Sequence, residues 1–264
     1  MRPLREFPLE ALRRVRFVLC DIDDTLTDGG RLSASAYGAL ERLHDAGYHV
    51  VPVTGRPAGW CDLIARFWPV DAVVGENGAF WFAYERAQRR MLRSFWRTPE
   101  QRAEDRRALN ALCERILAEV PGAAVAADQA YREADLAIDF REDTGPLSAD
   151  EVQTIVELFE AAGACAKVSS IHVNGWFGDY DKLAMTRRLL DERFGLDLVA
   201  AGEQILFVGD APNDAPMFAH FQHAVGVANV RDFAGRLPAE PAWITKGRGG
   251  KGFVELVAAL LEGR

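Results

Sequence analysis

The chain is poor in cysteine. Only four of its 264 residues are cysteine, namely Cys20, Cys61, Cys113 and Cys165, and no two of them form a Cys-x-x-Cys pair. A zinc ribbon needs such pairs, and a small disulfide-stapled scaffold needs cysteines at a higher density. The sequence therefore argues against both classes and favours a protein of the reducing cytoplasm.

Long apolar runs and an excess of positive charge are also missing. The first apolar run, residues 17–20, is too short for a signal peptide, and no run approaches the length of a membrane span. Lys and Arg number 31 against 39 Asp and Glu, which gives a net charge of −8 and a pI near 5.3. We therefore expect a cytoplasmic monomer or homodimer with no nucleic-acid partner and no membrane partner.

Strands and helices alternate at the start of the chain. Residues 15–20, 48–53 and 71–74 read as buried strands, and helices are predicted from Ser33 to Gly47 and through Leu63 and Phe67. Strands that alternate with helices indicate parallel βαβ units. The first part of the chain is therefore predicted to be an α/β fold with a doubly wound parallel sheet.

The pattern changes after residue 78. A hairpin is predicted at 79–83 and 90–95, followed by a helix at 99–118, strands at 123–127 and 136–140, a helix capped by Ser148 and Glu151, and strands at 164–169 and 170–174. The α/β rhythm resumes with a helix at 181–194, a strand at 204–208, short units at 224–227 and 242–244, and a last helix at 252–261. We therefore expect a discontinuous core, residues 1–82 and 177–264, and an inserted α+β domain at 83–176.

Polar residues that suit phosphate chemistry lie near the predicted strand and helix ends, where a doubly wound sheet binds its ligands. Carboxylates at such spacings hold hard cations, and a lysine at a helix N-terminus attracts an anion. Each signal alone also fits an ordinary turn, a cap or a surface lysine. The four signals are Asp21-x-Asp23-x-Thr25, Thr54-Gly55-Arg56, Lys182, and Gly209-Asp210-x-x-Asn213-Asp214.

In this order, the four signals resemble the motifs of the haloacid dehalogenase-like (HAD) hydrolase superfamily. The segment between the second and third motifs looks like the C2 cap of the Cof-like, subclass IIB branch, and the turn Glu76-Asn77-Gly78-Ala79 is typical of that branch. One departure is that Leu183 follows Lys182 where many relatives have glycine.

The resemblance implies a role for each matching residue. Asp21 would be the nucleophile and a Mg²⁺ ligand, and Asp23 the general acid and base with its carbonyl on the metal. The implied metal ligands also include Asp210 and Asp214, and the implied phosphate-binding residues are Thr54, Gly55, Lys182 and Asn213. Candidates for contact with the rest of the substrate are Arg56, Asn77, His172 and Asn174.

The sequence therefore predicts a Mg²⁺-dependent phosphomonoester hydrolase that acts through an aspartyl-phosphate, on a small sugar phosphate or related metabolite. A phosphomutase or phosphotransferase uses the same pair of aspartates and stays open as an alternative. So does a non-catalytic HAD protein that only binds a phosphorylated ligand. His172 also fits a packed histidine, and the arginines between residues 86 and 107 fit a solvated face better than an anion site.

Overall fold

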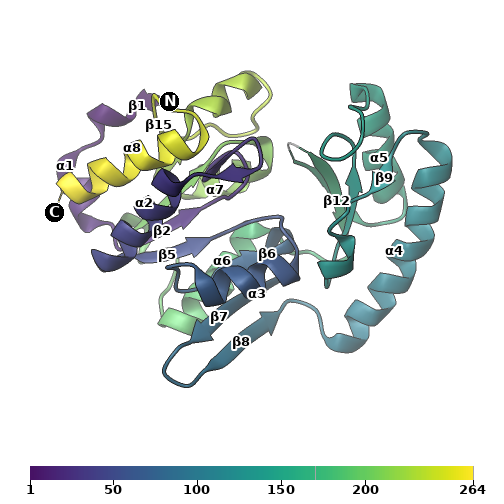
Figure 1. Cartoon of the computed structure of the whole chain (residues 1–264), viewed down its shortest axis with the longest axis horizontal. Coiled ribbons are helices and arrows are strands. Elements are labelled where there is room, and N and C mark those ends of the chain that lie inside the picture. The colour runs from purple at the N-terminus through teal and green to yellow at the C-terminus, as the bar shows by residue number, and fades with distance from the viewer. Residues whose placement is uncertain (170, 264) are drawn as a thin grey trace.

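The computed structural model describes residues 1–169 and 171–263, and a six-stranded parallel sheet lies at its centre (Figure 1). Each neighbouring pair in this sheet is parallel. The strands, in spatial order, are β1 (Arg2–Pro3), β15 (Trp243–Ile244), β14 (His223–Gly226), β13 (Ile205–Gly209), β2 (Phe17–Cys20) and β5 (His49–Pro52).

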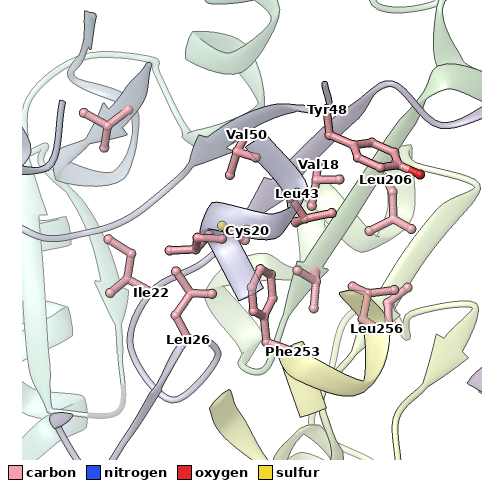
Figure 2. Close-up of a cluster of buried hydrophobic side chains, with 14 of the residues drawn as sticks. Val18, Cys20, Ile22, Leu26, Leu43, Tyr48, Val50, Leu206, Phe253 and Leu256 are labelled. Atoms are coloured by element: carbon pink, nitrogen blue, oxygen red, sulfur yellow. The ribbon is translucent and has the colours of Figure 1, made fainter. Parts of the chain in front are cut away.

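Helices cover both faces of this sheet because its strands are apolar on both sides. In β2, Val18 and Cys20 face one core cluster while Phe17 and Leu19 face the other. Figure 2 shows the first cluster, which includes Val18 from β2 together with Phe253 and Leu256. The first cluster is covered by α1 (Leu9–Arg14), α2 (Ala34–Asp45), α3 (Ala58–Phe67) and α8 (Gly249–Glu262), and the second by α6 (Lys182–Phe194) and α7 (Ala215–His220). The predicted doubly wound α/β fold is confirmed.

A three-stranded antiparallel sheet continues from the edge of the parallel one. It consists of β6 (Val73–Gly75), β7 (Phe80–Glu85) and β8 (Arg90–Phe95), so the predicted hairpin is present. Strand β6 lies between the two sheets. Its parallel pairing with the end of the preceding strand, as far as the described residues show, is a bridge between Val53 and Val74, and it pairs antiparallel with β7.

A separate four-stranded antiparallel sheet lies to the right of the parallel sheet in Figure 1. Its order is β11 (Cys165–Val168), β12 (His172–Trp176), β10 (Leu136–Asp139) and β9 (Ala124–Val125). Helices α4 (Pro99–Glu119) and α5 (Ala149–Ala161) pack on it around a third core cluster that includes Ile116, Ile138 and Phe159. Ser170, in the strand predicted at 170–174, lies outside the described residues. The domain boundaries at 83 and 176 stay a prediction.

Capping residues fix several helix ends as the sequence indicated. Ser33 accepts the backbone N–H of Ala36, and Ser148 and Glu151 form the predicted capping box at the start of α5. Gly195 ends α6 in the left-handed conformation with φ +61°. These local signals explain why the helix bounds agree with the predicted ones to within a few residues.

Several short elements were not predicted. They are α1, α7, the edge strand β1, the small hairpin of β3 (Thr27–Asp28) and β4 (Arg31–Leu32), and the 3₁₀ helices η1 (Leu4–Glu6), η2 (Glu76–Gly78), η3 (Gln129–Tyr131), η4 (Gly202–Gln204), η5 (Pro212–Asp214) and η6 (Ala228–Phe233). Helix α8 also begins earlier than expected, at Gly249. A Cβ on Gly250 would lie 2.7 Å from the carbonyl oxygen of Leu26, so only glycine lets the helix start this close to the turn after β2.

The four cysteines are unpaired thiols in different environments. Cys20 and Cys61 are buried, and burial raises the pKa of both thiols above the ordinary value. Cys113 is half-buried, whereas Cys165 on β11 is exposed. Within the described part of the chain, no helix is both long enough and apolar enough to cross a membrane.

Candidate active site

The strand order brings the first and last acidic motifs together. Strands β2 and β13 are parallel neighbours, with Cys20 opposite Val208, so Asp21 and Asp210 emerge side by side from the same edge of the sheet. The chain leaves β2 toward β5 on one side and β13 toward β14 on the other. Such a point, where successive connections diverge, is where open α/β sheets bind ligands.

Lys182 joins two of these carboxylates in the interior. Its Nζ donates to Asp21 Oδ1 at 2.8 Å and to Asp214 Oδ1 at 2.7 Å. All three residues are buried, with exposed fractions of 5% or less. Burial would lower the pKa of Lys182, but the two carboxylates more than compensate and raise it above its ordinary value. The lysine is therefore a fixed positive charge beside Asp21.

Burial has the opposite effect on the acids. It raises the pKa of Asp21 to about 7, with Asp214 and Asp23 adding to the rise and Lys182 opposing it. Burial and the charges of Asp21 and Asp214 also raise the pKa of Asp210 well above its ordinary value. The site thus holds more negative charge than one lysine neutralises, which favours the binding of a further cation.

Neutral donors orient the other two acids. Thr25 Oγ1 donates to Asp210 Oδ1 at 3.2 Å, and Asn229 Nδ2 donates to Asp210 Oδ2 at 3.0 Å. Asp214 Oδ2 accepts the backbone N–H of Asp210 at 3.1 Å. A Cβ at position 209 would lie 2.3 Å from that oxygen, so Gly209 is required for the carboxylate to reach its place.

The donor set fits Mg²⁺. Asp21, Asp210 and Asp214 each offer a carboxylate oxygen, and these atoms lie within 4.8 Å of one another. Carboxylate oxygens are the ligands that this small hard cation prefers. Asn213 lines the same cavity, and its Oδ1 is buried with no hydrogen-bond partner among the described residues. An unsatisfied buried oxygen of this kind indicates that the site is completed by a bound group.

Asp23 is held by an arginine of the second motif. Arg56 donates to the Asp23 carboxylate through Nε at 3.0 Å and through Nη2 at 2.9 Å, a forked pair that fixes the orientation of the acid. The Arg56 side chain is 6% exposed, whereas that of Asp23 is 26% exposed. Asp23 is therefore the more accessible of the two motif-one carboxylates. The guanidinium of Arg56 also stacks on the ring of Trp60 at 4.5 Å.

The rest of the second motif forms the wall beside Asp23. Gly55 and Asn77 line the cavity, and a Cβ on Gly55 would lie 3.1 Å from the Asn77 amide oxygen. Thr54 is fully buried, and its hydroxyl oxygen accepts the backbone N–H of Arg56 at 3.1 Å. In this structure Thr54 thus shapes the turn that carries Arg56.

The Asn77-Gly78 turn also places Lys182. Gly78 has φ +111°, and a Cβ there would lie 2.1 Å from the carbonyl oxygen of Asp181. Asp181 is the N-cap of α6 and accepts the N–H of Ala184 at 2.7 Å. The chain therefore returns to the core against Gly78, which explains why glycine is needed at this position.

Two predicted residues from β12 reach the same cavity. His172 Nε2 lies 2.9 Å from a carboxylate oxygen of Glu142, and Asn174 Nδ2 donates to Asp135 at 2.9 Å. Both are 3% exposed. Glu142, in the loop after β10, also accepts from Arg56 at 3.1 Å and thereby links the four-stranded sheet to the second motif.

A second cluster of charges joins the core to the loops of the four-stranded sheet, and no motif in the sequence points to it. The carboxylate of Glu76 is fully buried and accepts the backbone N–H of Ala58 at 2.9 Å and those of Glu133, Ala134 and Asp135 at 2.7–3.0 Å. Burial, and then the charge of Asp135, raise the pKa of Glu76 to about 7. Arg132 completes the cluster by donating to Asp128, Asp135 and the carbonyl oxygen of Gly55.

Most of the predicted residues surround one cavity. Lys182 and Asp214 lie behind the cavity wall, where Lys182 donates to Asp21 and Asp214 accepts the backbone N–H of Asp210. Arg132, Glu142 and Asn229 were missed, although Asn229 follows β14 of the parallel sheet and so obeys the same strand-end rule. The cavity is lined by Asp21, Asp23, Gly55, Arg56, Asn77, Arg132, Ser169, Ile171, His172, Asn174, Asp210, Ala211 and Asn213.

Comparison with known proteins agrees with this geometry. Residues 15–222 match the model of a family described as haloacid dehalogenase-like hydrolase. A search of curated protein sequences finds no match. A putative HAD/COF-like hydrolase from Plasmodium vivax superimposes with a TM-score of 0.69 at 18% identity, over 97% of this chain and 100% of that one.

Two solved phosphatases are similar in fold. The sucrose-phosphatase of Synechocystis, solved with sucrose and phosphate, has a TM-score of 0.61 at 14% identity, over 92% of this chain and 97% of that one. A sugar phosphatase of HAD subclass IIB has a TM-score of 0.59 at 16% identity, over 88% and 93% of the two chains. At these identities the likeness concerns the fold.

Proposed function

The chain belongs to the haloacid dehalogenase-like hydrolase family, and from this premise we propose that it is a Mg²⁺-dependent phosphomonoester hydrolase with Asp21 as its nucleophile. One observation carries the proposal. The buried carboxylate of Asp21 lies beside a fixed lysine and within reach of two further carboxylates. This arrangement suits a nucleophile that must approach a negatively charged phosphate.

Charge neutralisation is the first requirement of the reaction. Asp21, Asp210 and the backbone carbonyl of Asp23 would hold Mg²⁺, and Asp214 would support its waters. When bound, the ion offsets the negative charge of the phosphate and of Asp21. Lys182 supplies a second positive charge from the protein itself, and Gly55 and Asn213 line the space for the phosphate oxygens.

In the first step, an oxygen of Asp21 attacks the phosphorus atom, and the bond from phosphorus to the ester oxygen breaks. Asp23, in its protonated form, gives its proton to that oxygen, so that the alcohol leaves as a neutral molecule. The product on the enzyme is the aspartyl-phosphate of Asp21.

In the second step, the ionised Asp23 takes a proton from water, and the water oxygen attacks the same phosphorus atom. The bond to Asp21 breaks, which releases inorganic phosphate and restores the free carboxylate. Arg56 holds the Asp23 carboxylate in a forked pair and would thereby keep it oriented toward the ester oxygen in the first step and toward the water in the second.

A small sugar phosphate is the proposed substrate class. The cavity lies between the core motifs and the loops of the four-stranded sheet, so a macromolecular substrate would have to pass that sheet to reach the buried Asp21. The solved sugar phosphatases of similar fold support the same class.

Release of free phosphate from a panel of phosphorylated metabolites, with and without Mg²⁺, tests the proposal. Asp21→Asn should abolish turnover, whereas Asp28→Asn, in the same acidic segment but outside the cavity lining, should retain it. Retained turnover in Asp21→Asn would refute the mechanism. Transfer of the phosphoryl group to a second hydroxyl, instead of its release as free phosphate, would identify a phosphotransferase.

A further inference from the structure

We propose that the catalytic cavity selects phosphate esters whose leaving group carries no negative charge, and that Glu142 sets this selectivity. The inference rests on the proposed phosphatase function and concerns only the part of the substrate that departs as the alcohol.

Both arginines that line the cavity are already neutralised by carboxylates. Arg56 contacts Asp23 at 2.9 Å, Glu142 at 3.1 Å and Asp128 at 3.5 Å. Its side chain is 6% exposed, so these contacts are shielded from water. An arginine with three carboxylate partners has little capacity left for a substrate carboxylate.

Arg132 is in the same situation. It contacts Asp128 at 3.1 Å and Asp135 at 3.0 Å, and its side chain is 1% exposed. Its Nη1 also donates to the carbonyl oxygen of Gly55 at 3.0 Å. The arginine therefore fixes the wall of the cavity and does not extend a free cation into it.

No surplus positive charge remains on the leaving-group side. Among the described residues, the basic side chains lining the cavity are Arg56, Arg132 and His172. Four carboxylates face them, those of Asp23, Asp128, Asp135 and Glu142. When Asp23 is protonated, as the first step requires, the other three carboxylates are still at least equal in number to these basic side chains, so no surplus positive charge is left for the substrate. A second anionic group on the substrate would meet like charge in a partly desolvated space.

Glu142 is the acid placed to act on the leaving group. Asp128 and Asp135 are buried and locked by Arg132, whereas the side chain of Glu142 is 31% exposed. It lines the outward opening that Asp23 also lines. Because Asp23 is the proposed proton donor to the departing oxygen, that opening is where the alcohol lies.

Uncharged hydroxyl groups suit the remaining lining. Asn77 and Ser169 offer hydrogen-bond donors and acceptors without net charge. Arg141 is exposed and lines the outer opening but not the cavity itself. Capture of a substrate carboxylate by Arg141 would oppose the proposed selectivity.

Matched pairs of esters test the selectivity. sn-Glycerol 3-phosphate and 3-phosphoglycerate differ by a hydroxymethyl against a carboxylate group, and glucose 6-phosphate and 6-phosphogluconate form a second pair. With Mg²⁺ present, kcat/KM should favour the neutral member of each pair by about tenfold or more, which corresponds to roughly 1.4 kcal/mol. Titration calorimetry with Asp21→Asn and Mg²⁺ should give the same order of affinities without turnover.

Glu142→Gln tests the residue assignment. Removal of this charge frees part of Arg56, so the preference for the neutral ester should fall by about threefold or more. Asp143→Asn, one residue further in the same loop, should leave the preference unchanged. Far-UV circular dichroism checks that both variants are folded.

Each outcome decides the proposal. Equal kcat/KM and equal affinity within the pairs, or a preference for the carboxylated esters, would overturn the charge selectivity. A preference that Glu142→Gln leaves unmoved would overturn the role of Glu142. Absence of turnover with every ester would refute the phosphatase function, and the calorimetric affinities would still decide the selectivity.

Discussion

In a Glu76→Gln protein, two backbone N–H groups that now donate to a carboxylate oxygen would face an amide NH₂ group. Glu76 Oε1 accepts from Ala58 and Glu133, and Oε2 accepts from Ala134 and Asp135. Glutamine has the same shape, but only one of its two terminal atoms accepts hydrogen bonds. Whichever way the amide is turned, two donors lose their partner.

The size of the effect follows from burial. Glu76 is fully buried, so water does not replace the lost bonds. A buried donor without a partner costs about 1–3 kcal/mol. Two such donors, partly relieved by local relaxation, should lower the free energy of unfolding by about 3 kcal/mol.

Urea denaturation followed by circular dichroism measures this loss. A buffer at about pH 8 keeps Glu76 ionised, because its pKa is raised to about 7. Amide hydrogen exchange at Ala134 and Asp135 should become faster in the variant. Glu133→Gln is the matched control, since that side chain is 48% exposed and its surface pair with Arg102 contributes about 0–1 kcal/mol. A loss below about 1 kcal/mol in Glu76→Gln would refute the reasoning.

Three further predictions follow from contacts at the same site. Gly78→Ala should lower the free energy of unfolding by about 2 kcal/mol or more, because its Cβ would lie 2.1 Å from the Asp181 carbonyl oxygen at φ +111°; an unchanged urea midpoint would contradict this contact. Lys182→Met should cost about 3 kcal/mol in Mg²⁺-free buffer, since it leaves two buried carboxylates without their cation; a variant as stable as the original in urea would disprove it. His172, and then the charge of Arg56, lower the pKa of Glu142 from 4.5 to about 2 against the effect of burial, so the stability from its ionised form is present above pH 4.5 and is lost as pH falls toward 2. The difference in the free energy of unfolding between the original protein and Glu142→Gln should be about 1 kcal/mol near pH 6, after solvent screening, and should vanish near pH 2. A difference that persists in acid would contradict the assigned cause.

The parallel sheet could be predicted because its strands are apolar on both faces and its helices carry clear caps. Ser33 and Ser148 are examples of caps that the sequence shows directly. The partnership of β6 could not be predicted in the same way. Its residues suit a parallel or an antiparallel neighbour, and the choice depends on the hairpin that follows it. Short edge strands such as β1 also leave too few residues for a pattern.

The candidate site could be predicted where its residues follow core strands. Asp21, Asp210 and Lys182 come together because β2 and β13 are neighbours and α6 begins beside them. Glu142 and Arg132 could not be found from the core pattern, since they belong to loops of the four-stranded sheet. Their role depends on how that sheet sits on the core, which is fixed by long-range contacts such as the one between Arg56 and Glu142.

The uneven distribution of the four thiols has a practical consequence. Cys20 and Cys61 are buried with raised pKa values, which keeps them protonated and shielded, while Cys165 is exposed on β11. A thiol-reactive dye should therefore attach first at Cys165. Because β11 belongs to the four-stranded sheet, the unaltered protein offers a fluorescent reporter on that part of the molecule, with no cysteine to add and none to remove.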